Sequence, residues 1–369
     1  MASVKFVHIA DSHLSRPFGF LPPALAEERR RDQRQTLTRV VDLALERDVD
    51  LFLVSGDLFD RPDPDPTDVE AVTAGIGRLL EAGKRVFAIP GNHDFCTSNS
   101  FWHRLDAPGL RIFLEPECEH VVLDDLGVAV AGSAFDRSQS ERRAFDRIEL
   151  PKDAPCILLL HASLESFGVQ LERYHPFSLA ELESCGAAYV ALGHYHRLNT
   201  VASDGVTACY PGSFEGLGFD GPETDDRHIV FGEIAEDGKA AVEPVKVNRR
   251  TMRAAELDCT SFETQAGLDE AVRRLCDADA LLSLKLTGAP IQDLLASIEE
   301  IPARFRESVA HMEVDSSALS GAPDLCLDNS IRGRFCKHLL DRIEASADTD
   351  TTRLLRRALD LGLSALSDG

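Results

Sequence analysis

Short apolar runs recur before about residue 200, and each ends in a polar turn. Their nearly continuous apolar character predicts strands that are covered on both faces. Apolar positions at helical spacing lie between them, at about residues 25–47 and 68–82. This alternation predicts a layered α/β sheet whose strand order stays open, with further, antiparallel strands at 128–135 and 228–235. The five apolar strands are VKFVHIA (4–10), LFLVS (51–55), RVFAIP (85–90), CILLLH (156–161) and YVALGH (189–194).

The pattern changes after Asn248. Strand-like and helical stretches follow one another over residues 252–315, which predicts a small α+β unit. Two amphipathic helical patterns come last, at 331–344 and 351–366. The predicted divisions are a main domain at 1–250, a small α+β domain at 251–320 and a helical C-terminal tail at 321–369.

The composition is that of an ordinary globular protein, with 44% hydrophobic residues. No apolar run approaches the ~20 residues needed to cross a bilayer, and the first residues show no targeting pattern. These features predict a cytoplasmic protein with no membrane partner. The nine cysteines form no C-x-x-C pair, so we interpret them as buried thiols rather than as disulfides or zinc ligands.

The formal net charge of −23 excludes a protein that grips nucleic acid over its whole surface. If the substrate is DNA, then metal ions, a local arginine patch or a partner must supply the attraction. An arginine run follows the first polar turn, but a solvated helix face is the favoured interpretation over a DNA contact. The RYHPFS segment (173–178) is interpreted as a surface loop rather than as a rim of the active site. The run consists of Arg29, Arg30, Arg31 and Arg34.

Side chains that bind metal ions follow each of the five apolar strands. The carboxyl ends of strands in an open α/β sheet lie along one edge, so these residues are expected to converge there. Carboxylate, amide oxygen and imidazole together suit Mn²⁺, Fe²⁺ or Zn²⁺. Their number suffices for two ions ~3.5–4 Å apart, which could share an aspartate and clamp a phosphate for in-line displacement. Glycines at 56, 91 and 193 fit turns that pass close to ions.

The motifs D-x-H, GD-x-x-D, GNHD, a single histidine and GH-x-H occur in this order and resemble the signature of the calcineurin-like metallophosphoesterases over residues 6–214. The resemblance implies a layered α/β metallophosphoesterase sandwich with two divalent metal ions, of which Mn²⁺ is favoured and Fe²⁺ or Zn²⁺ stay open. It implies that His93 is the catalytic histidine and that Asp94 orients it. The implied metal ligands are Asp11, His13 and His196 for one ion, Asn92, His161 and His194 for the other, and Asp57 as the bridge.

Four segments are similar to the SbcD-type DNA repair exonucleases: HIADSHL, GDLFDRP, GHYH and YPGSFEGLGF. The layout of catalytic domain, small capping domain and helical tail is similar as well. This resemblance implies metal-dependent hydrolysis of DNA, and docking of an SbcC-like coiled-coil ATPase on the C-terminal helices. Many relatives have a histidine where this chain has Asp60, so no role in DNA contact or metal binding is transferred to Asp60. The polarity of cutting, an exonuclease against an endonuclease, and a homodimer stay open.

Two other functions are compatible with these residues. The same site could serve a phosphatase or a small-molecule or cyclic-nucleotide phosphodiesterase, although Pro62 and the GNHD motif depart from the protein phosphatases that GDLFDR resembles. The chain could also be a catalytically silent scaffold for an ATPase partner. The complete set of ligand types argues against the scaffold.

Overall fold

A computed structural model gives the fold, and the chain divides into two compact units, Met1–Thr251 and Met252–Gly369. No helix in the described part of the chain is long and apolar enough to cross a membrane. The described residues are 3–98, 100–105, 107–135, 137, 141–146, 148–167, 174–203, 205–319, 330–346, 348, 351–352, 354–355, 357–359 and 362.

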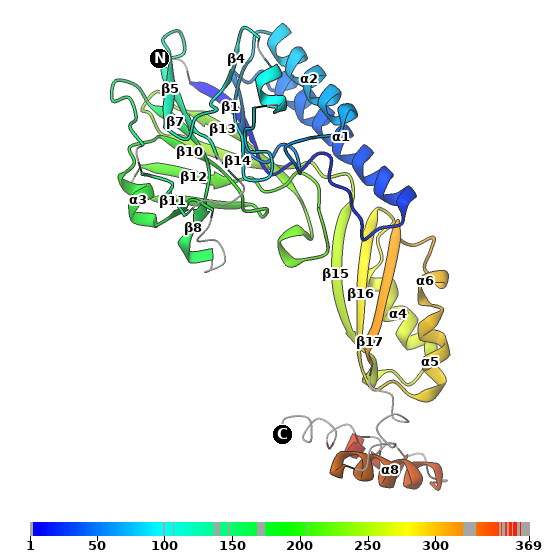
Figure 1. Cartoon of the computed structure of the whole chain (residues 1–369). Coiled ribbons are helices and arrows are strands. Elements are labelled where there is room, and N and C mark those ends of the chain that lie inside the picture. Colours follow the sequence, from blue (N-terminus) through cyan, green and yellow to red (C-terminus); the bar gives the residue numbers. More distant parts are fainter. Residues whose placement is uncertain are drawn as a thin grey trace. The chain divides into compact units, whose positions relative to one another are not determined.

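The N-terminal unit contains two sheets of six strands each (Figure 1). The first sheet has the order β14-β13-β1-β2-β3-β4. Its four strands β1 to β4 run parallel, β13 pairs antiparallel with β1, and β14 pairs antiparallel with β13. These strands are β1 (Val4–Ile9), β2 (Leu51–Ser55), β3 (Arg85–Ile89), β4 (Leu110–Ile112), β13 (His228–Ile234) and β14 (Ala240–Lys246).

The second sheet has the order β11-β12-β10-β7-β6-β5. Its central strands β12, β10, β7 and β6 are parallel, and β11 and β5 pair antiparallel at the two edges. A short parallel pair, β8 (Ser163–Leu164) and β9 (Pro176–Phe177), stands apart from it. The strands of the sheet are β5 (Glu119–Leu123), β6 (Val128–Ser133), β7 (Cys156–His161), β10 (Tyr189–Gly193), β11 (Asn199–Ser203) and β12 (Val206–Tyr210).

The two sheets bury one shared apolar core between them. Phe6 and Leu53 of the first sheet lie in one cluster with Leu159 and Tyr189 of the second. Such burial on both faces explains why these strands are apolar almost throughout. The prediction of a layered α/β sandwich is therefore confirmed, as are the five predicted strands. The strand predicted at 128–135 is antiparallel to β5 but parallel to β7, so that part of the prediction is only half correct.

Two helices cover the outer face of the first sheet, as Figure 1 shows. Helices α1 (Pro23–Glu46) and α2 (Pro66–Glu81) place Val41 and Val72 in one cluster with Val54 of β2. Both helices begin with proline, and α2 is capped by Asp65, whose carboxylate accepts the Thr67 N–H. The short helix α3 (Leu179–Ser184) and the 3₁₀ turns Phe101–Arg104, Glu165–Phe167 and Gly221–Glu223 also belong to the described part of this unit.

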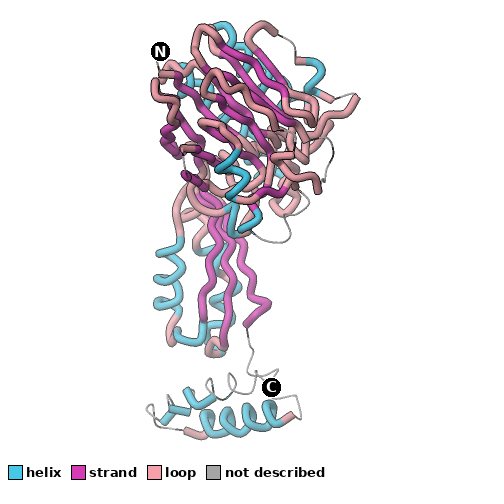
Figure 2. The backbone as a smooth tube through the Cα atoms, turned by 90° about the vertical axis from the view of Figure 1, so that its left-hand side faces the viewer, coloured by secondary structure: helices cyan, strands magenta, loops and turns pink. Residues whose placement is uncertain are grey.

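The C-terminal unit contains a three-stranded sheet with the order β15-β16-β17. Leu282, Leu284 and Leu286 of β16 pack against Leu268 and Val272 of α4, and Figure 2 shows the helices along the strands. This alternation along β16 is typical of a sheet that has one covered face. The elements are β15 (Thr251–Asp258), the 3₁₀ turn Cys259–Ser261, α4 (Gln265–Leu275), β16 (Ala280–Gly288), α5 (Gln292–Glu299), α6 (Ile301–Arg304) and β17 (His311–Leu319).

Helix α8 (Ile331–Glu344) follows in the C-terminal unit, and Ser330 caps it by accepting the Gly333 N–H. Cys336 and Leu339 of α8 pack against Leu355 and Leu359 of the segment that follows. The predicted second helical pattern at 351–366 is helical at 351–352, 354–355, 357–359 and 362, and its other residues lie outside the described ones. A separate tail domain at 321–369 stays a prediction.

Candidate dinuclear metal site

The ends of five strands from both sheets meet in the N-terminal unit. Backbone hydrogen bonds connect the segments that follow β1 and β2, from the Asp11 N–H to the Gly56 carbonyl and from the His13 N–H to the Asp57 carbonyl. Asp11, His13 and Asp57 have φ values of 51°, 44° and 49°, and His194 has 98°. This left-handed backbone is uncommon for residues with a side chain. The segments therefore turn sharply at the strand ends and direct polar side chains inward.

All three predicted glycines lie where no side chain fits: a Cβ atom at Gly193 would be 2.0 Å from the Ser55 carbonyl oxygen. A Cβ atom at Gly91 would be 2.2 Å from Asp57 Oδ1, and one at Gly56 would be 2.4 Å from His161 Nδ1. Gly56 also has a φ of +86°, which glycine adopts without strain. These glycines therefore allow the backbone to approach the polar side chains of the site, in addition to any approach to ions.

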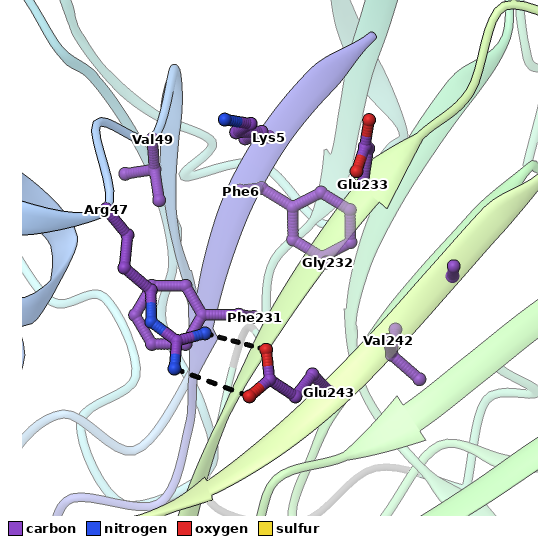
Figure 3. A pocket seen from close by; sticks show the side chains of 10 residues that line it. Lys5, Phe6, Arg47, Val49, Phe231, Gly232, Glu233, Val242 and Glu243 are labelled. Atoms are coloured by element: carbon purple, nitrogen blue, oxygen red, sulfur yellow. Dashed lines mark hydrogen bonds and ion pairs between the residues drawn. The ribbon is translucent and has the colours of Figure 1, made fainter.

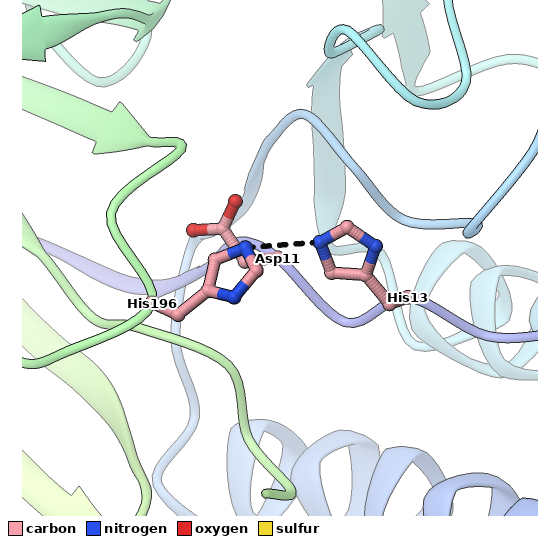
Figure 4. A group of neighbouring side chains, drawn as sticks. All are labelled: Asp11, His13 and His196. Atoms are coloured by element: carbon pink, nitrogen blue, oxygen red, sulfur yellow. Dashed lines mark hydrogen bonds between the residues drawn. The ribbon is translucent and has the colours of Figure 1, made fainter. Parts of the chain in front are cut away.

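Asp11, His13 and His196 form the first group of candidate ligands (Figure 4). The Nε2 atoms of His13 and His196 face each other at 3.1 Å. Asp11 Oδ1 accepts the His194 N–H at 2.8 Å, while Asp11 Oδ2 is buried and has no hydrogen-bond partner in the described part of the chain. Two imidazole nitrogens and one carboxylate oxygen thus converge on one place.

Asp57, His161 and His194 form the second group. Asn92 belongs to it as well, because its Oδ1 lies 3.0 Å from His161 Nε2 and 2.9 Å from His194 Nδ1. His161 and Asn92 are buried, with 1% and 7% of their surface exposed. This group therefore combines imidazole with amide and carboxylate oxygens.

Asp57 lies between the two groups. Its Oδ2 atom is 3.6 Å from His13 Nε2 of the first group and 3.3 Å from His161 Nε2 of the second. Like Asp11 Oδ2, it is buried without a hydrogen-bond partner among the described residues. A buried carboxylate oxygen with no partner is costly, and a divalent cation with oxygen and nitrogen ligands removes that cost. The residues present therefore fit two divalent metal ions that share Asp57.

The electrostatics of the site keep Asp57 ionised. Burial alone would raise the pKa of Asp57, but the nearby histidines, His161 first among them, hold it well below its usual range. Burial would likewise lower the pKa of His161, yet Asp57 raises it to about 9. Burial does raise the pKa of Asp11. Asp57 is thus held in the anionic state that a bridging ligand needs.

His93 lies at the exposed mouth of the site. Its ring centroid is 4.7 Å from that of His13, and its side chain forms a further group with His13 and Asp57. The His93 N–H donates to Asp57 Oδ1 at 2.8 Å, and His93 Nδ1 lies 3.2 Å from the Asp60 carbonyl oxygen. His93 is therefore close to the candidate ligands and open to a substrate.

The Asp94 carboxylate points to the backbone rather than to the His93 ring. It accepts the Gly91 N–H at 2.7 Å and the Phe59 N–H at 3.1 Å. Burial, followed by the charge of Asp57, raises the pKa of Asp94 to about 7. In this structure Asp94 connects the GNHD turn to the turn after β2, and the contact to the His93 ring comes from the Asp60 carbonyl.

Two carboxylates outside the predicted ligand set contact its histidines. Asp60 Oδ1 lies 3.1 Å from His13 Nδ1, and Glu223 Oε1 is hydrogen-bonded to His196 Nδ1. Asp60 stands in the GDLFD motif, but its partner depends on how the turns after β1 and β2 pack. Glu223 lies in a 3₁₀ turn far from any ligand motif, and no sequence pattern indicates it.

The interpretation of residues 173–178 as a surface loop is wrong for the part that the structure describes. The ring of Tyr174 stacks on that of His194, with centroids 4.5 Å apart. His175 is buried, and its ring stacks on Phe135 at 3.9 Å. This segment therefore lies against the second group of ligands, because the short strand β9 holds it there.

The interpretation of the arginine run as a solvated helix face is wrong for Arg29. This guanidinium is fully buried and pairs with Asp32 and Glu215, each at 3.0 Å. Glu215 also accepts the Thr36 hydroxyl and the Arg249 N–H. The network connects α1 to the segment after β12, which belongs to the YPGSFEGLGF motif, so Arg29 has a structural role.

The cavity shown in Figure 3 lies at β1, β13 and β14 and has a volume of about 400 Å³. Arg47 forms a two-fold hydrogen bond with Glu243 and lies 4.2 Å from the centre of the Phe231 ring. None of the residues that line it is a candidate metal ligand. The chemistry therefore lies at the strand ends.

An α/β sandwich with paired imidazole and carboxylate groups at its strand ends defines a metal-dependent phosphoesterase. The family model "Calcineurin-like phosphoesterase" matches residues 4–198, and the chain belongs to this family.

Known relatives include DNA repair proteins. The chain is 30% identical over 272 residues to "DNA double-strand break repair protein Mre11" of Aeropyrum pernix, a match that covers 69% of this chain and 63% of that protein. It is 27% identical over 342 residues to the Mre11 protein of Haloferax volcanii, covering 88% of this chain and 70% of that one. It is 25% identical over 304 residues to "Uncharacterized metallophosphoesterase YhaO" of Bacillus subtilis, covering 79% and 71%.

Proposed function

We propose that the protein is a metal-dependent DNA exonuclease of the SbcD type that acts in DNA repair and hydrolyses phosphodiester bonds by a two-metal in-line mechanism. One observation carries the mechanism: Asp57 Oδ2 lies within 3.6 Å of a histidine nitrogen in each of the two ligand groups. The names of the Mre11 relatives and the SbcD-like motifs support DNA as the substrate.

Each metal ion has its own ligands in this proposal. When bound, the ions would supply an activated hydroxide and polarise the phosphate, and Mn²⁺ suits the mixed ligands. Asp57 would be a ligand of both ions, and the nearby histidines keep it negatively charged in spite of its burial. The first ion would be held by Asp11, His13 and His196, and the second by Asn92, His161 and His194.

His93 is the proposed catalytic histidine. Its exposed ring lies beside the Asp57 carboxylate and can donate a proton to the leaving oxygen of a phosphodiester. Asp94 would act through the backbone, because its two hydrogen bonds hold the turn that carries His93. The Asp60 carbonyl oxygen, which lies 3.2 Å from His93 Nδ1, orients the His93 ring.

A phosphodiesterase or phosphatase for small substrates is the second candidate. The YhaO relative is named only as an uncharacterized metallophosphoesterase, and the same ligands would serve many phosphate esters. Because His93 is exposed, its position is compatible with both small and large substrates. A silent scaffold has less support, because every ligand type for two ions is present.

One assay separates these candidates. End-labelled duplex DNA, single-stranded DNA and bis-p-nitrophenyl phosphate are incubated with Mn²⁺, Fe²⁺ or Zn²⁺, with His93→Ala as the inactive control. We expect Mn²⁺-dependent release of nucleotides from duplex ends. Hydrolysis of the small diester without DNA cleavage would refute the nuclease and leave the phosphoesterase, and no hydrolysis of any substrate would favour the scaffold.

The C-terminal helices are the proposed docking site for an SbcC-like coiled-coil ATPase. The apolar side chains of α8 pack partly on Leu355 and Leu359, yet Ile331 and Leu354 remain 76% and 72% exposed. A DNA-binding partner would also offset the net charge of −23, which opposes binding to phosphates. A chain that ends at residue 328 should keep hydrolysis of the small diester and lose the ATPase. Equal co-purification of the ATPase with both chains would contradict the docking site.

A further inference from the structure

The two ligand groups differ in what holds their histidines. In the first group, both histidines have a carboxylate on the ring nitrogen that faces away from the other ligands: Asp60 contacts His13 Nδ1, and Glu223 contacts His196 Nδ1. In the second group, His161 Nδ1 lies 2.9 Å from the Ser55 carbonyl, which is uncharged.

The groups also differ in negative charge. Asp11 belongs to the first group, and Asp60 and Glu223 stand directly behind it. The second group has the neutral amide of Asn92 in the corresponding place. Asp57 lies within reach of both groups, 3.6 Å from His13 Nε2 and 3.3 Å from His161 Nε2, so it is left out of this comparison. Apart from the shared Asp57, the first group therefore has one carboxylate ligand and two carboxylates hydrogen-bonded to its histidines, whereas the hydrogen-bond partners described for the histidine rings of the second group are uncharged.

Neighbouring arginines reduce this difference without removing it. Arg16 pairs with Asp60 at 3.1 Å, but its side chain is 32% exposed, so water screens its charge. Arg227 is buried and lies 4.0 Å from Glu223 Oε2, while its shorter contacts are with the Ser213 hydroxyl at 2.7 Å and with main-chain carbonyls such as that of Ser213 at 3.1 Å. Glu223 Oε1 remains on His196.

A carboxylate on the outer nitrogen of a metal-binding histidine fixes the tautomer, orients the ring and makes the inner nitrogen a stronger donor. Both histidines of the first group gain these effects. On the basis of the dinuclear site proposed above, we infer that the two metal sites are unequal. The site of Asp11, His13 and His196 binds its metal ion first and with the higher affinity. Asp60 and Glu223 are the positioning residues that raise this affinity. The second site binds its ion at a higher metal concentration, and the rate of hydrolysis rises as this second site becomes occupied.

Titration of the metal-free full-length protein with Mn²⁺ tests the order of filling. Bound metal is measured by calorimetry and by electron paramagnetic resonance, in which one ion gives an uncoupled spectrum and a second, bridged ion gives a coupled one. We expect two steps. His196→Ala should abolish the tighter step, and His194→Ala, a change in the same GHYH motif, should abolish the weaker one. The reverse assignment would overturn the inference.

Two further variants test the positioning residues. Glu223→Gln and Asp60→Asn keep the shape of each side chain and remove its charge, and each should weaken the tighter step about 10- to 100-fold. Glu243→Gln, which removes a carboxylate paired with Arg47 on the surface, is the matched control and should leave both steps unchanged. Thermal unfolding of the metal-free variants separates a loss of metal affinity from a loss of fold. The two substitutions lie in different turns, so Asp60→Asn remains informative if Glu223→Gln unfolds.

The outcomes distinguish this inference from the proposed function. Two equivalents of Mn²⁺ that bind with equal affinity would refute the inequality, and unchanged steps in Glu223→Gln and Asp60→Asn would refute the role of these two carboxylates. Both results would leave the dinuclear site in place. Binding of a single equivalent at saturation would refute the dinuclear site itself.

Discussion

The two units of the chain bury their polar residues very differently. Every polar or charged side chain that is buried among the described residues lies between His8 and Asn248, in the N-terminal unit. In the C-terminal unit, β16 alternates between buried leucines and outward residues such as Lys285. The C-terminal unit follows the ordinary rule for a sheet with one face in solvent, in which apolar residues are buried and polar residues are exposed. The N-terminal unit departs from this rule because it buries polar residues as well.

The difference has a physical consequence. Buried polar groups cost free energy unless hydrogen bonds, ion pairs or metal ions satisfy them. In the N-terminal unit, ion pairs satisfy Arg29, and metal ions would satisfy the buried carboxylate oxygens of Asp11 and Asp57 at the strand ends. We therefore expect charge-removing substitutions to act through metal binding, catalysis or ion pairing in the N-terminal unit. In the C-terminal unit only packing should matter.

The largest effect is expected at the shared ligand. Asp57→Asn removes a full negative charge from between the two ligand groups and should bring hydrolysis of a phosphodiester to the background level. Metal analysis of the purified variant should show fewer bound equivalents than the wild type. Retention of two equivalents together with full activity would show that Asp57 is not the bridge.

The next largest effect is expected on catalysis, with no change in metal binding. His93→Ala should lower kcat by roughly 10²–10⁴-fold, the usual range for a general acid, while the metal content stays that of the wild type. His93 lies at the exposed mouth of the site, and the other nearby histidines supply the ligand groups. Parallel loss of metal and activity would reassign His93 as a ligand.

A third effect is expected on stability, where buried Arg29 and surface Arg30 of α1 should differ. Arg29→Met leaves Glu215 buried without its main cationic partner, which should lower the free energy of unfolding by about 3–5 kcal/mol. The matched control is Arg30→Met, because Arg30 pairs with Glu27 on the surface and should change stability by less than about 1 kcal/mol. Urea unfolding of both variants measures the difference. Equal effects would show that the buried network contributes no more than a surface pair.

The smallest effect on activity is expected in the C-terminal unit. Leu284→Ala opens a cavity in the core of that unit and should cost about 2–5 kcal/mol in its unfolding free energy. Hydrolysis of a small diester and Mn²⁺ affinity should stay unchanged, because Leu284 belongs to the core of the C-terminal unit and the candidate ligand groups belong to the N-terminal unit. A fall in Mn²⁺ affinity would contradict the expectation that substitutions in the C-terminal unit act only through packing.

The sequence by itself determined which strands form and which residue types end them. The apolar runs before Asp11, Asp57, Asn92, His161 and His194 are strands of buried sheets, and the motif order is sufficient to recognise the family. This succeeds because strand burial and turn chemistry are local properties, written in consecutive residues.

Only the tertiary structure decided which side chains satisfy one another. Glu223 comes to His196 from a 3₁₀ turn, Asp94 faces backbone N–H groups rather than His93, and Arg29 turns inward to Glu215. A buried charge finds its partner through the packing of segments that are distant in the chain: Arg29 and Glu215 are 186 positions apart. Hydrophobic periodicity carries no record of such pairings, because it reports only which face of an element is covered.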